Sequence, residues 1–310
     1  MICSNCKEKP AVYHRKYSGQ KLCKNCFCKS IERKVAKTIT KYKMLSKNDK
    51  IAFGLSGGKD SVTLLNIMNK MQKEHQNFSI NVITVDEGIE KYREDSIKIV
   101  DQIIENLNLK YNLVTFKELY GYTLDEIVNI LNKKGDFKTK ACSYCGILRR
   151  RALNKVAKEM GADKLATAHN IDDEAETILM NITRSDITRL LRYDPIPYKK
   201  HPHFVPRIKP YREIPEKEIS LYAYYKNLPI HSVECPYASE SMRRNIKTVM
   251  SILEQKNPSV KFNLLKFYDR VFPKNQTDFQ KFDNFKACSK CNEPTSSEIC
   301  KFCELMENIS

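Results

Sequence analysis

The stretch Lys50-Ile-Ala-Phe-Gly-Leu-Ser56, followed by Gly57-Gly58-Lys59-Asp60-Ser61, decides the fold class. Its first part is a short apolar run typical of a buried strand. Apolar side chains then follow the glycines at helical spacing, at Val62, Leu65, Met68 and Met71. The sequence therefore predicts a strand, a glycine turn and a helix. In a parallel α/β sheet such a turn lies beyond the carboxyl end of its strand, where ligands bind.

The alternation of strand and helix patterns continues along the chain. Further strands are predicted over 80–85, 113–116 and 165–168, and helices over 92–107 and 147–160, the last ending at Gly161. From residue 218 onward the sequence is mostly helical, including 242–253 and 260–272. Alternating elements of this kind predict an α/β fold built on a parallel sheet.

The glycine turn at 56–61 is suited to holding phosphate. Its backbone N–H groups and both serine hydroxyls can donate to phosphate oxygens at a helix N-terminus, and Lys59 adds positive charge. A carboxylate at Asp60 would repel phosphate unless a divalent cation lay between them, which indicates a Mg²⁺-nucleotide site. The Walker A pattern places Ser or Thr after Gly-Lys, so an ordinary NTPase switch is disfavoured. The alternative is a tight turn without a ligand.

The cysteines divide the chain into three parts. Pairs of Cys-x₂-Cys at both ends are typical of four-thiolate zinc sites. These residues are Cys3, Cys6, Cys23 and Cys26 in the first group, and Cys288, Cys291, Cys300 and Cys303 in the second. We expect an N-terminal zinc finger over 1–30, a core domain over 31–272, and a linker with a C-terminal zinc finger over 273–310. Cys28 is interpreted as a buried thiol, with replacement of Cys26 as ligand left open.

Three cysteines remain in the core, at Cys142, Cys145 and Cys235. Three thiolates suit an iron-sulfur cluster with one open iron. An open coordination position can bind exogenous sulfide, as an open zinc site binds water. Spacing alone slightly favours a pair of buried thiols with an unrelated third cysteine.

Charge and hydropathy indicate what kind of partner the protein has and where in the cell it works. The chain has 54 Lys and Arg against 37 Asp and Glu, for a formal charge of +17. This excess suggests a polyanionic partner, although a Lys-rich chain from an AT-rich genome would show it too. With no apolar run of about 18 residues, we expect no membrane association and a cytoplasmic location. Because thiols stay reduced in the cytoplasm, the twelve cysteines indicate metal binding rather than disulfides.

Two motifs together resemble a known family. The turn at 56–61 resembles the phosphate motif of PP-loop ATP pyrophosphatases, which adenylate a carbonyl oxygen and release pyrophosphate. The run 168–177 begins Ala168-His-Asn-Ile-Asp-Asp173 and resembles the second signature of the tRNA-thiolating branch, in which the residue at Asp173 is essential. Acidic residues in a first helical turn could also be simple dipole partners. With Cys142-x₂-Cys145-Gly-x₂-Arg149 and the other cysteines, nearly the whole chain resembles the tRNA 2-thiouridine synthetases of the TtcA/TtuA family.

The resemblance implies a Rossmann-like PP-loop fold, of the adenine nucleotide alpha hydrolase type, flanked by two zinc-binding modules. It implies ATP with Mg²⁺, two zinc ions, and a [4Fe-4S] cluster with one open iron held by the three core cysteines. It also implies tRNA as partner, a homodimer, and a sulfur donor that is a ubiquitin-like thiocarboxylate protein, a cysteine desulfurase or free sulfide.

The expected site follows from the same resemblance. The catalytic residues would be Lys59, Asp60, Arg149 and Asp173. The nucleotide would contact Gly54, Leu55, Ser56, Gly57, Gly58, Ser61, Val85, Asp86 and Ala168. A uridine would leave its stack, and its C2 oxygen would attack the α-phosphate while Mg²⁺, Lys59 and Arg149 stabilise the charge. Sulfide on the open iron would then replace AMP. Candidates for the RNA backbone are Lys133, Lys134, Lys138, Lys140, Arg150, Arg151, Arg243 and Arg244.

Several alternatives stay open at this point. The Thr183-Arg-Ser-Asp186 segment favours the anticodon wobble uridine, while relatives modify a thymine-loop uridine or an anticodon-loop cytidine. A PP-loop enzyme that ligates lysine to tRNA would need no cluster. A noncatalytic subunit of a thiolation complex would be expected to have lost the phosphate loop or the core cysteines. A zinc-ribbon nucleic-acid binder would not bind Mg-ATP tightly.

Overall fold

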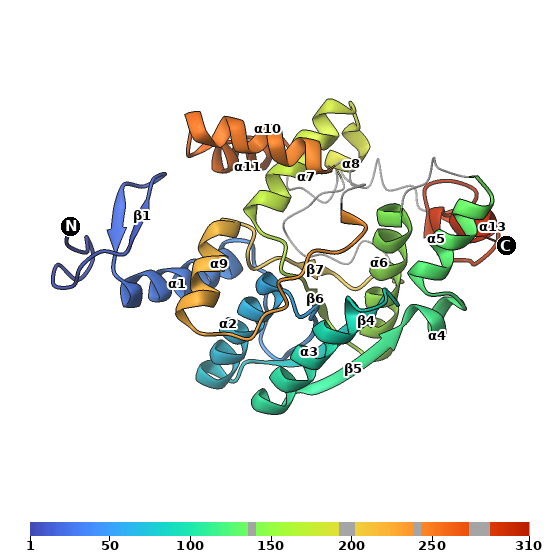
Figure 1. Cartoon of the computed structure of the whole chain (residues 1–310), viewed down its shortest axis with the longest axis horizontal. Coiled ribbons are helices and arrows are strands. Elements are labelled where there is room, and N and C mark those ends of the chain that lie inside the picture. Colours follow the sequence, from blue (N-terminus) through green and yellow to red (C-terminus); the bar gives the residue numbers. More distant parts are fainter. Residues whose placement is uncertain (136–140, 192–201, 239–242, 273–285, 310) are drawn as a thin grey trace.

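The computed structural model describes residues 1–135, 141–191, 202–238, 243–272 and 286–309 of the chain (Figure 1). Its centre is a five-stranded sheet in the order β5-β4-β3-β6-β7, in which every neighbouring pair is parallel. The strands are β3 (Asp49–Gly54), β4 (Phe78–Asp86), β5 (Lys110–Thr115), β6 (Lys164–Ala166) and β7 (Arg207–Ile208). The predicted α/β fold with a parallel sheet is confirmed.

The strand order reverses at β3, which pairs with β4 on one side and with β6 on the other. In doubly wound sheets this reversal opens a crevice at the carboxyl ends of the strands, where ligands bind. The glycine turn follows β3 directly, and the 168–177 signature follows β6. The fold therefore brings the two sequence motifs to opposite sides of one crevice.

Helices cover both faces of the sheet. Side chains of neighbouring strand residues point to opposite faces, so Ile51 and Phe53 join one hydrophobic core and Ala52 joins another. The first core contains α1 (Lys24–Lys41), α2 (Lys59–His75), α3 (Arg93–Leu107) and α9 (Glu216–Tyr225). The second contains α4 (Phe116–Tyr120), α5 (Leu124–Lys133) and α6 (Ala141–Glu159). Burial on both faces explains why the β3 sequence is apolar without alternation.

Several predicted boundaries were wrong, among them the start of β5, which is Lys110, and the end of β6, which is Ala166. The strand predicted over 113–116 ends at Thr115, because Thr115 and Glu118 form a capping box that starts α4 at Phe116. The helix predicted over 147–160 begins at Ala141, so α6 carries both Cys142 and Cys145. Gly161, with φ of +63°, follows its end as expected.

A helical layer lies over the carboxyl edge of the sheet (Figure 1). It consists of α7 (Ile171–Thr183), α8 (Ile187–Leu191), α10 (Arg243–Lys256) and α11 (Val260–Val271), with α10 and α11 packed on α7. The predicted helices over 242–253 and 260–272 are confirmed with small changes at their ends, except that Met242 lies outside the described residues. In the described parts of the chain, no helix has the length and hydrophobicity to cross a bilayer.

The two cysteine-rich modules lie at opposite ends of the molecule (Figure 1). The N-terminal one contains the hairpin of β1 (Tyr13–Arg15) and β2 (Gln20–Leu22), and α1 runs from it into the core without a break. The buried Arg15 guanidinium lies 2.7 Å from Glu218 of α9, which fixes the hairpin to the domain. The C-terminal one contains β8 (Lys286–Ala287), β9 (Pro294–Thr295) and α13 (Lys301–Ile309), and α13 packs on α5 and α6.

Candidate functional site

The glycine turn has a backbone that only glycine accommodates at its centre. Gly57 has φ of +81°, and a Cβ there would lie 2.8 Å from the carbonyl oxygen of Ser96. Gly58, the N-cap of α2, has no side chain that could cap the helix. The first N–H groups of α2 therefore have no side-chain cap from Gly58, as in anion-binding helix starts.

The two serine hydroxyls hold the turn in shape. The Ser61 hydroxyl accepts a hydrogen bond from the Ser56 N–H at 3.2 Å and donates to the Gly58 carbonyl at 3.0 Å. The Ser56 and Ser61 hydroxyl oxygens are 3.1 Å apart. The turn is thus held by hydrogen bonds of its own, and both hydroxyls lie where a phosphate oxygen could replace one of these contacts.

Two partly buried carboxylates, Asp60 and Asp173, lie close enough in the crevice for the charge of one to act on the other. Oδ1 of Asp60 is buried and has no hydrogen-bond partner in the described part of the chain. Burial raises the pKa of Asp60, Lys59 opposes that rise, and the charges of Glu216 and Asp173 add to it. Burial also raises the pKa of Asp173, with Arg243 opposing. An orphaned carboxylate oxygen beside a second carboxylate fits a divalent cation, because the ion would relieve both penalties.

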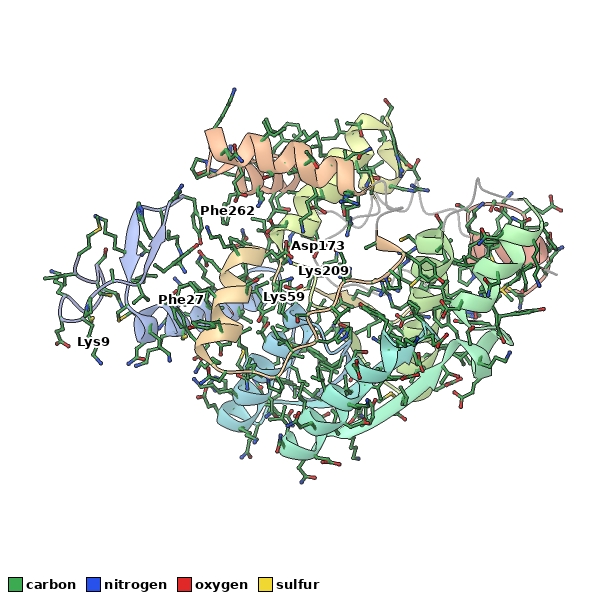
Figure 2. The ribbon with its side chains drawn as sticks, in the orientation of Figure 1. Lys9, Phe27, Lys59, Asp173, Lys209 and Phe262 are labelled. Carbon is green, nitrogen blue, oxygen red and sulfur yellow. The ribbon has the colours of Figure 1, made fainter. Side chains whose placement is uncertain are left out.

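Lys59 lies between two carboxylates at this edge of the sheet. Its Nζ is 3.1 Å from Oδ2 of Asp60 and 2.7 Å from Oε1 of Glu216, and Glu216 also lies 3.1 Å from Nζ of Lys247. Figure 2 shows Lys59 and Asp173 below the α10 and α11 layer. Sequence reasoning missed Glu216, because only the docking of α9 against α2 brings it to the turn.

The three acidic residues at 172–174 have two different roles. Asn170 and Asp173 form a capping box, and the other oxygen of Asp173 lies 3.1 Å from Arg243. Asp172 accepts a bond from the Glu216 N–H at 2.8 Å and pairs with a lysine of α11. Glu174 is buried and pairs with Lys209 at 2.9 Å. Asp173 therefore faces the crevice, while its two neighbours tie α7 to the rest of the fold.

The nucleotide residues predicted from the sequence gather at the same edge. Gly54 ends β3 and Leu55 follows it, Val85 and Asp86 end β4, and Ala168 follows β6. These three strands are neighbours in the sheet, so their carboxyl ends meet. The set surrounds the crevice on the side of the sheet where the glycine turn begins.

The three core cysteines come from two distant segments. Cys142 and Cys145 lie on α6, and Cys235 follows α9. Cys145 and Cys235 line a cavity of about 150 Å³ together with Ser56 of the glycine turn and Arg149. Burial raises the pKa of the Cys145 thiol to about 11, with Arg149 opposing, and burial also raises that of Cys235. The cavity thus joins the phosphate turn to the thiols.

The terminal cysteines have a tighter arrangement. Within each group of four, all Sγ atoms lie within 4.8 Å of one another, with Cys6 and Cys23 at 3.9 Å and Cys291 and Cys300 at 3.6 Å. Tetrahedral Zn²⁺ with bonds of about 2.3 Å places its sulfur ligands about 3.8 Å apart. Backbone N–H groups lower the pKa of Cys288 to about 6, which favours the thiolate that zinc binds.

Among the described residues, these two groups alone are that compact. Cys26 belongs to the first group, and Cys28 lies buried in the hydrophobic core beside it, as an ordinary core thiol would. The core trio is more open, which suits a cubane, since its thiolates bind separate irons, and does not suit a single tetrahedral ion. The residues present therefore fit one cluster and two single-ion sites.

The predicted basic residues separate by their contacts. Arg149 lines the cavity, is half exposed, and lies 3.5 Å from Glu87. Arg151 lies over the Phe302 ring at 4.0 Å and directs a nitrogen toward Cys291 Sγ at 3.8 Å, so its charge faces the C-terminal module. Of the RNA-backbone candidates, Lys133, Lys134, Arg150 and Arg244 are exposed, Arg243 is engaged with Asp173, and Lys138 and Lys140 lie outside the described residues.

Comparison with known proteins gives two family matches. A family model described as a PP-loop domain matches residues 28–246, and one described as the 2-thiouridine synthetase TtuA N-terminal LIM domain matches residues 2–28. The tRNA 2-thiolation protein NcsA of Haloferax volcanii is 34% identical over 100% of this chain and 99% of its own length. Cytoplasmic tRNA 2-thiolation protein 1 of Danio rerio is 36% identical over 99% of this chain and 88% of its own length.

A solved structure is similar over almost the same extent. It is described as the U34-tRNA thiolase NcsA from Methanococcus maripaludis with its [4Fe-4S] cluster. It has 36% identity and a TM-score of 0.83, and the match covers 99% of this chain and 96% of that one. The similarity therefore includes the PP-loop domain and both terminal modules.

Proposed function

This chain belongs to the tRNA 2-thiolation proteins of the PP-loop family and is an ATP-dependent tRNA thiolase, and we propose that its substrate base is the anticodon wobble uridine. The choice of the wobble position rests on the similarity to the U34-tRNA thiolase NcsA, and the thiolation chemistry is supported by the cavity shared by Ser56 of the glycine turn, Arg149, and two of the core cysteines. A base in that cavity would meet the phosphate site on one side and the thiols on the other.

The glycine turn and its carboxylates perform the activation step. The α2 N-terminus and the serine hydroxyls bind the phosphates, and Asp60 and Asp173 are the residues that would hold Mg²⁺, which would offset phosphate charge. The uridine C2 oxygen attacks the α-phosphorus of ATP, the bond to pyrophosphate breaks, and an adenylated base results. Arg149, at the cavity wall, stabilises the charge that develops on phosphate oxygens, and its fork geometry suits that contact. Lys59 supplies charge once phosphate displaces its present partners.

The core cysteines serve the second step. A [4Fe-4S] cluster bound by Cys142, Cys145 and Cys235 would supply an open iron position for the incoming sulfur. The chain orients that position, because α6 carries both Arg149 and two of the ligands, so the phosphate contact and the cluster site move as one body. Sulfur replaces oxygen at C2 and AMP leaves.

We assign zinc binding to the two terminal modules. Each four-cysteine group holds one zinc ion, and the divisions at 1–30, 31–272 and 273–310 are kept as modules with separate metal sites. The exposed basic residues near the crevice bind the tRNA backbone, in agreement with the formal charge of +17. We also propose a homodimer that takes its sulfur from a thiocarboxylate protein, a cysteine desulfurase or free sulfide.

The test is direct. Protein purified without oxygen is incubated with ATP, Mg²⁺, sulfide and tRNA transcripts, and the nucleosides are analysed by mass spectrometry. We expect 2-thiouridine that depends on ATP and disappears when the wobble uridine is replaced by adenosine. Thiolation that survives this replacement would move the target to the thymine loop or to an anticodon-loop cytidine. No thiolated nucleoside from cluster-reconstituted protein would contradict the proposed activity.

A further inference from the structure

One wall of the shared cavity is not used by the proposed reaction. Besides Ser56 and the two cysteines, the cavity is lined by Ile89, Tyr92 and His231. This wall therefore offers a base an apolar side chain, an aromatic ring and an imidazole.

The His231 ring is held against the glycine turn. Its backbone N–H donates to the carbonyl oxygen of Gly57 at 2.9 Å, and the residue forms an isolated parallel bridge with Gly58. The Tyr92 ring meets the imidazole edge-on, with centroids 5.0 Å apart and an interplanar angle of 71°. The position of the imidazole is thus fixed relative to the phosphate turn and to one wall of the cavity.

One ring nitrogen of His231 has no hydrogen-bond partner among the described residues. This nitrogen, Nε2, is buried. Two polar groups of this wall pair with each other: Arg93 Nε lies 2.9 Å from Glu87 Oε2, and Arg93 also donates to the carbonyl oxygens of Ser56 and Val85. A buried nitrogen left unpaired is unfavourable, so Nε2 is a group in this wall that a ligand atom could satisfy.

We propose that His231 is the residue that recognises the target base, with Nε2 accepting a hydrogen bond from N3–H of uracil while Tyr92 flanks the ring. This inference rests on the proposed function and deepens it. In uracil N3 carries a hydrogen, whereas in cytosine N3 is an acceptor, so an acceptor at this point selects uracil. C2 is bonded to N3, so the same contact sets the direction of the C2 carbonyl relative to the glycine turn.

The experiment compares His231→Leu, which removes the acceptor at similar size, with His231→Gln, whose amide oxygen can replace it. The matched control is His75→Leu, an exposed histidine at the end of α2. Thiolation is measured on transcripts that carry uridine or cytidine at the target position, with iron content recorded for each variant. Binding of fluorescent anticodon stem-loop RNAs with the same two bases is measured by anisotropy without ATP.

We expect His231→Leu to lower kcat/KM for the uridine substrate about 10–100-fold, to leave cytidine thiolation unchanged and to keep its iron. His231→Gln should recover most of the uridine rate. The same loss of preference for uridine should appear in RNA binding, which needs no catalysis and so tests the inference even if thiolation fails in every variant. Equal effects on both bases, loss of iron, or no effect beyond that of His75→Leu would overturn the assignment.

Discussion

The terminal cysteine groups and the core cysteines share the spacing Cys-x₂-Cys but differ in geometry. In each terminal group four sulfurs converge within 4.8 Å. In the core, Cys145 and Cys235 instead open onto a cavity with Arg149 and Ser56. Spacing therefore identifies a metal-binding pair, while the helices and strands around it decide whether the site is closed or can receive a reactant.

The largest expected effect comes from replacing Asp173, the carboxylate in the crevice. Asp173→Asn keeps the capping geometry but removes a charge that acts on Asp60 and that we assign to Mg²⁺ binding, so we expect thiolation to fall about a thousandfold, or about 4 kcal/mol, with little change in melting temperature. The matched variant is Asp172→Asn, whose side chain contacts the N-terminus of α9 and a lysine of α11. That variant should lower the melting temperature and retain most activity. Equal losses of activity in the two variants would contradict this division.

The next effect separates two arginines that are two residues apart on α6. Arg149→Ala should lower the thiolation rate about 100-fold, because the guanidinium that stabilises phosphate charge is lost from the cavity. Arg151→Ala should leave the rate near that of the wild type and weaken the C-terminal module, since Arg151 covers Phe302 and points at Cys291. Steady-state kinetics and thermal unfolding measure the two effects. A large rate loss in Arg151→Ala with a normal rate in Arg149→Ala would contradict this assignment.

A ligand of a closed site should affect stability more than chemistry. Cys291→Ser removes one thiolate of the C-terminal group, so we expect that site to lose its zinc while the iron content stays the same. The module holds α13 against the core, where the Tyr144 hydroxyl donates to the Leu305 carbonyl at 3.2 Å. The melting temperature should therefore fall by several degrees. Loss of iron together with zinc would show that the two kinds of site are not independent.

The smallest expected effect is a pH dependence of stability that arises from Glu176, on the same helix as Asp173. Burial raises the pKa of Glu176 from 4.5 to about 7, with Arg243 and Lys247 of α10 opposing and Asp173 adding. The raised pKa means that the contribution of Glu176 to stability is complete below pH 4.5 and is lost as pH rises through 7. Glu176→Gln should match the wild type at low pH and melt about 2–4 °C higher at pH 8. A difference that is the same at both pH values would contradict the burial argument.

The sheet could be predicted from the sequence because each strand and helix carries its own local pattern. The apolar run of β3 and the glycines after it suffice to predict the turn, and the spacing of the terminal cysteines suffices to predict the four-sulfur groups. The capping boxes at Thr115 and Thr123 are also local signals, of the form Thr-x-x-Glu, and could have predicted the starts of α4 and α5.

The rest of the site depends on contacts between distant segments. Glu216 reaches Lys59 only because α9 docks beside α2, and His231 reaches the glycine turn only through its backbone bond to Gly57. No periodicity or spacing in the sequence marks either residue. Likewise, the three successive acids at 172–174 look equivalent in sequence, and tertiary contacts alone assign one to the crevice and two to structural pairs.

The core cysteines are proposed to hold an iron-sulfur cluster, and the terminal groups single ions. The measurement is iron, sulfide and zinc content with visible absorbance, for anaerobically purified wild type, Cys142→Ala and the buried-thiol control Cys28→Ala. We predict a broad visible band in the wild type and the control that disappears in Cys142→Ala, with zinc unchanged in all three. A wild-type protein that stays colourless after cluster reconstitution, or iron that persists in Cys142→Ala, would contradict the account.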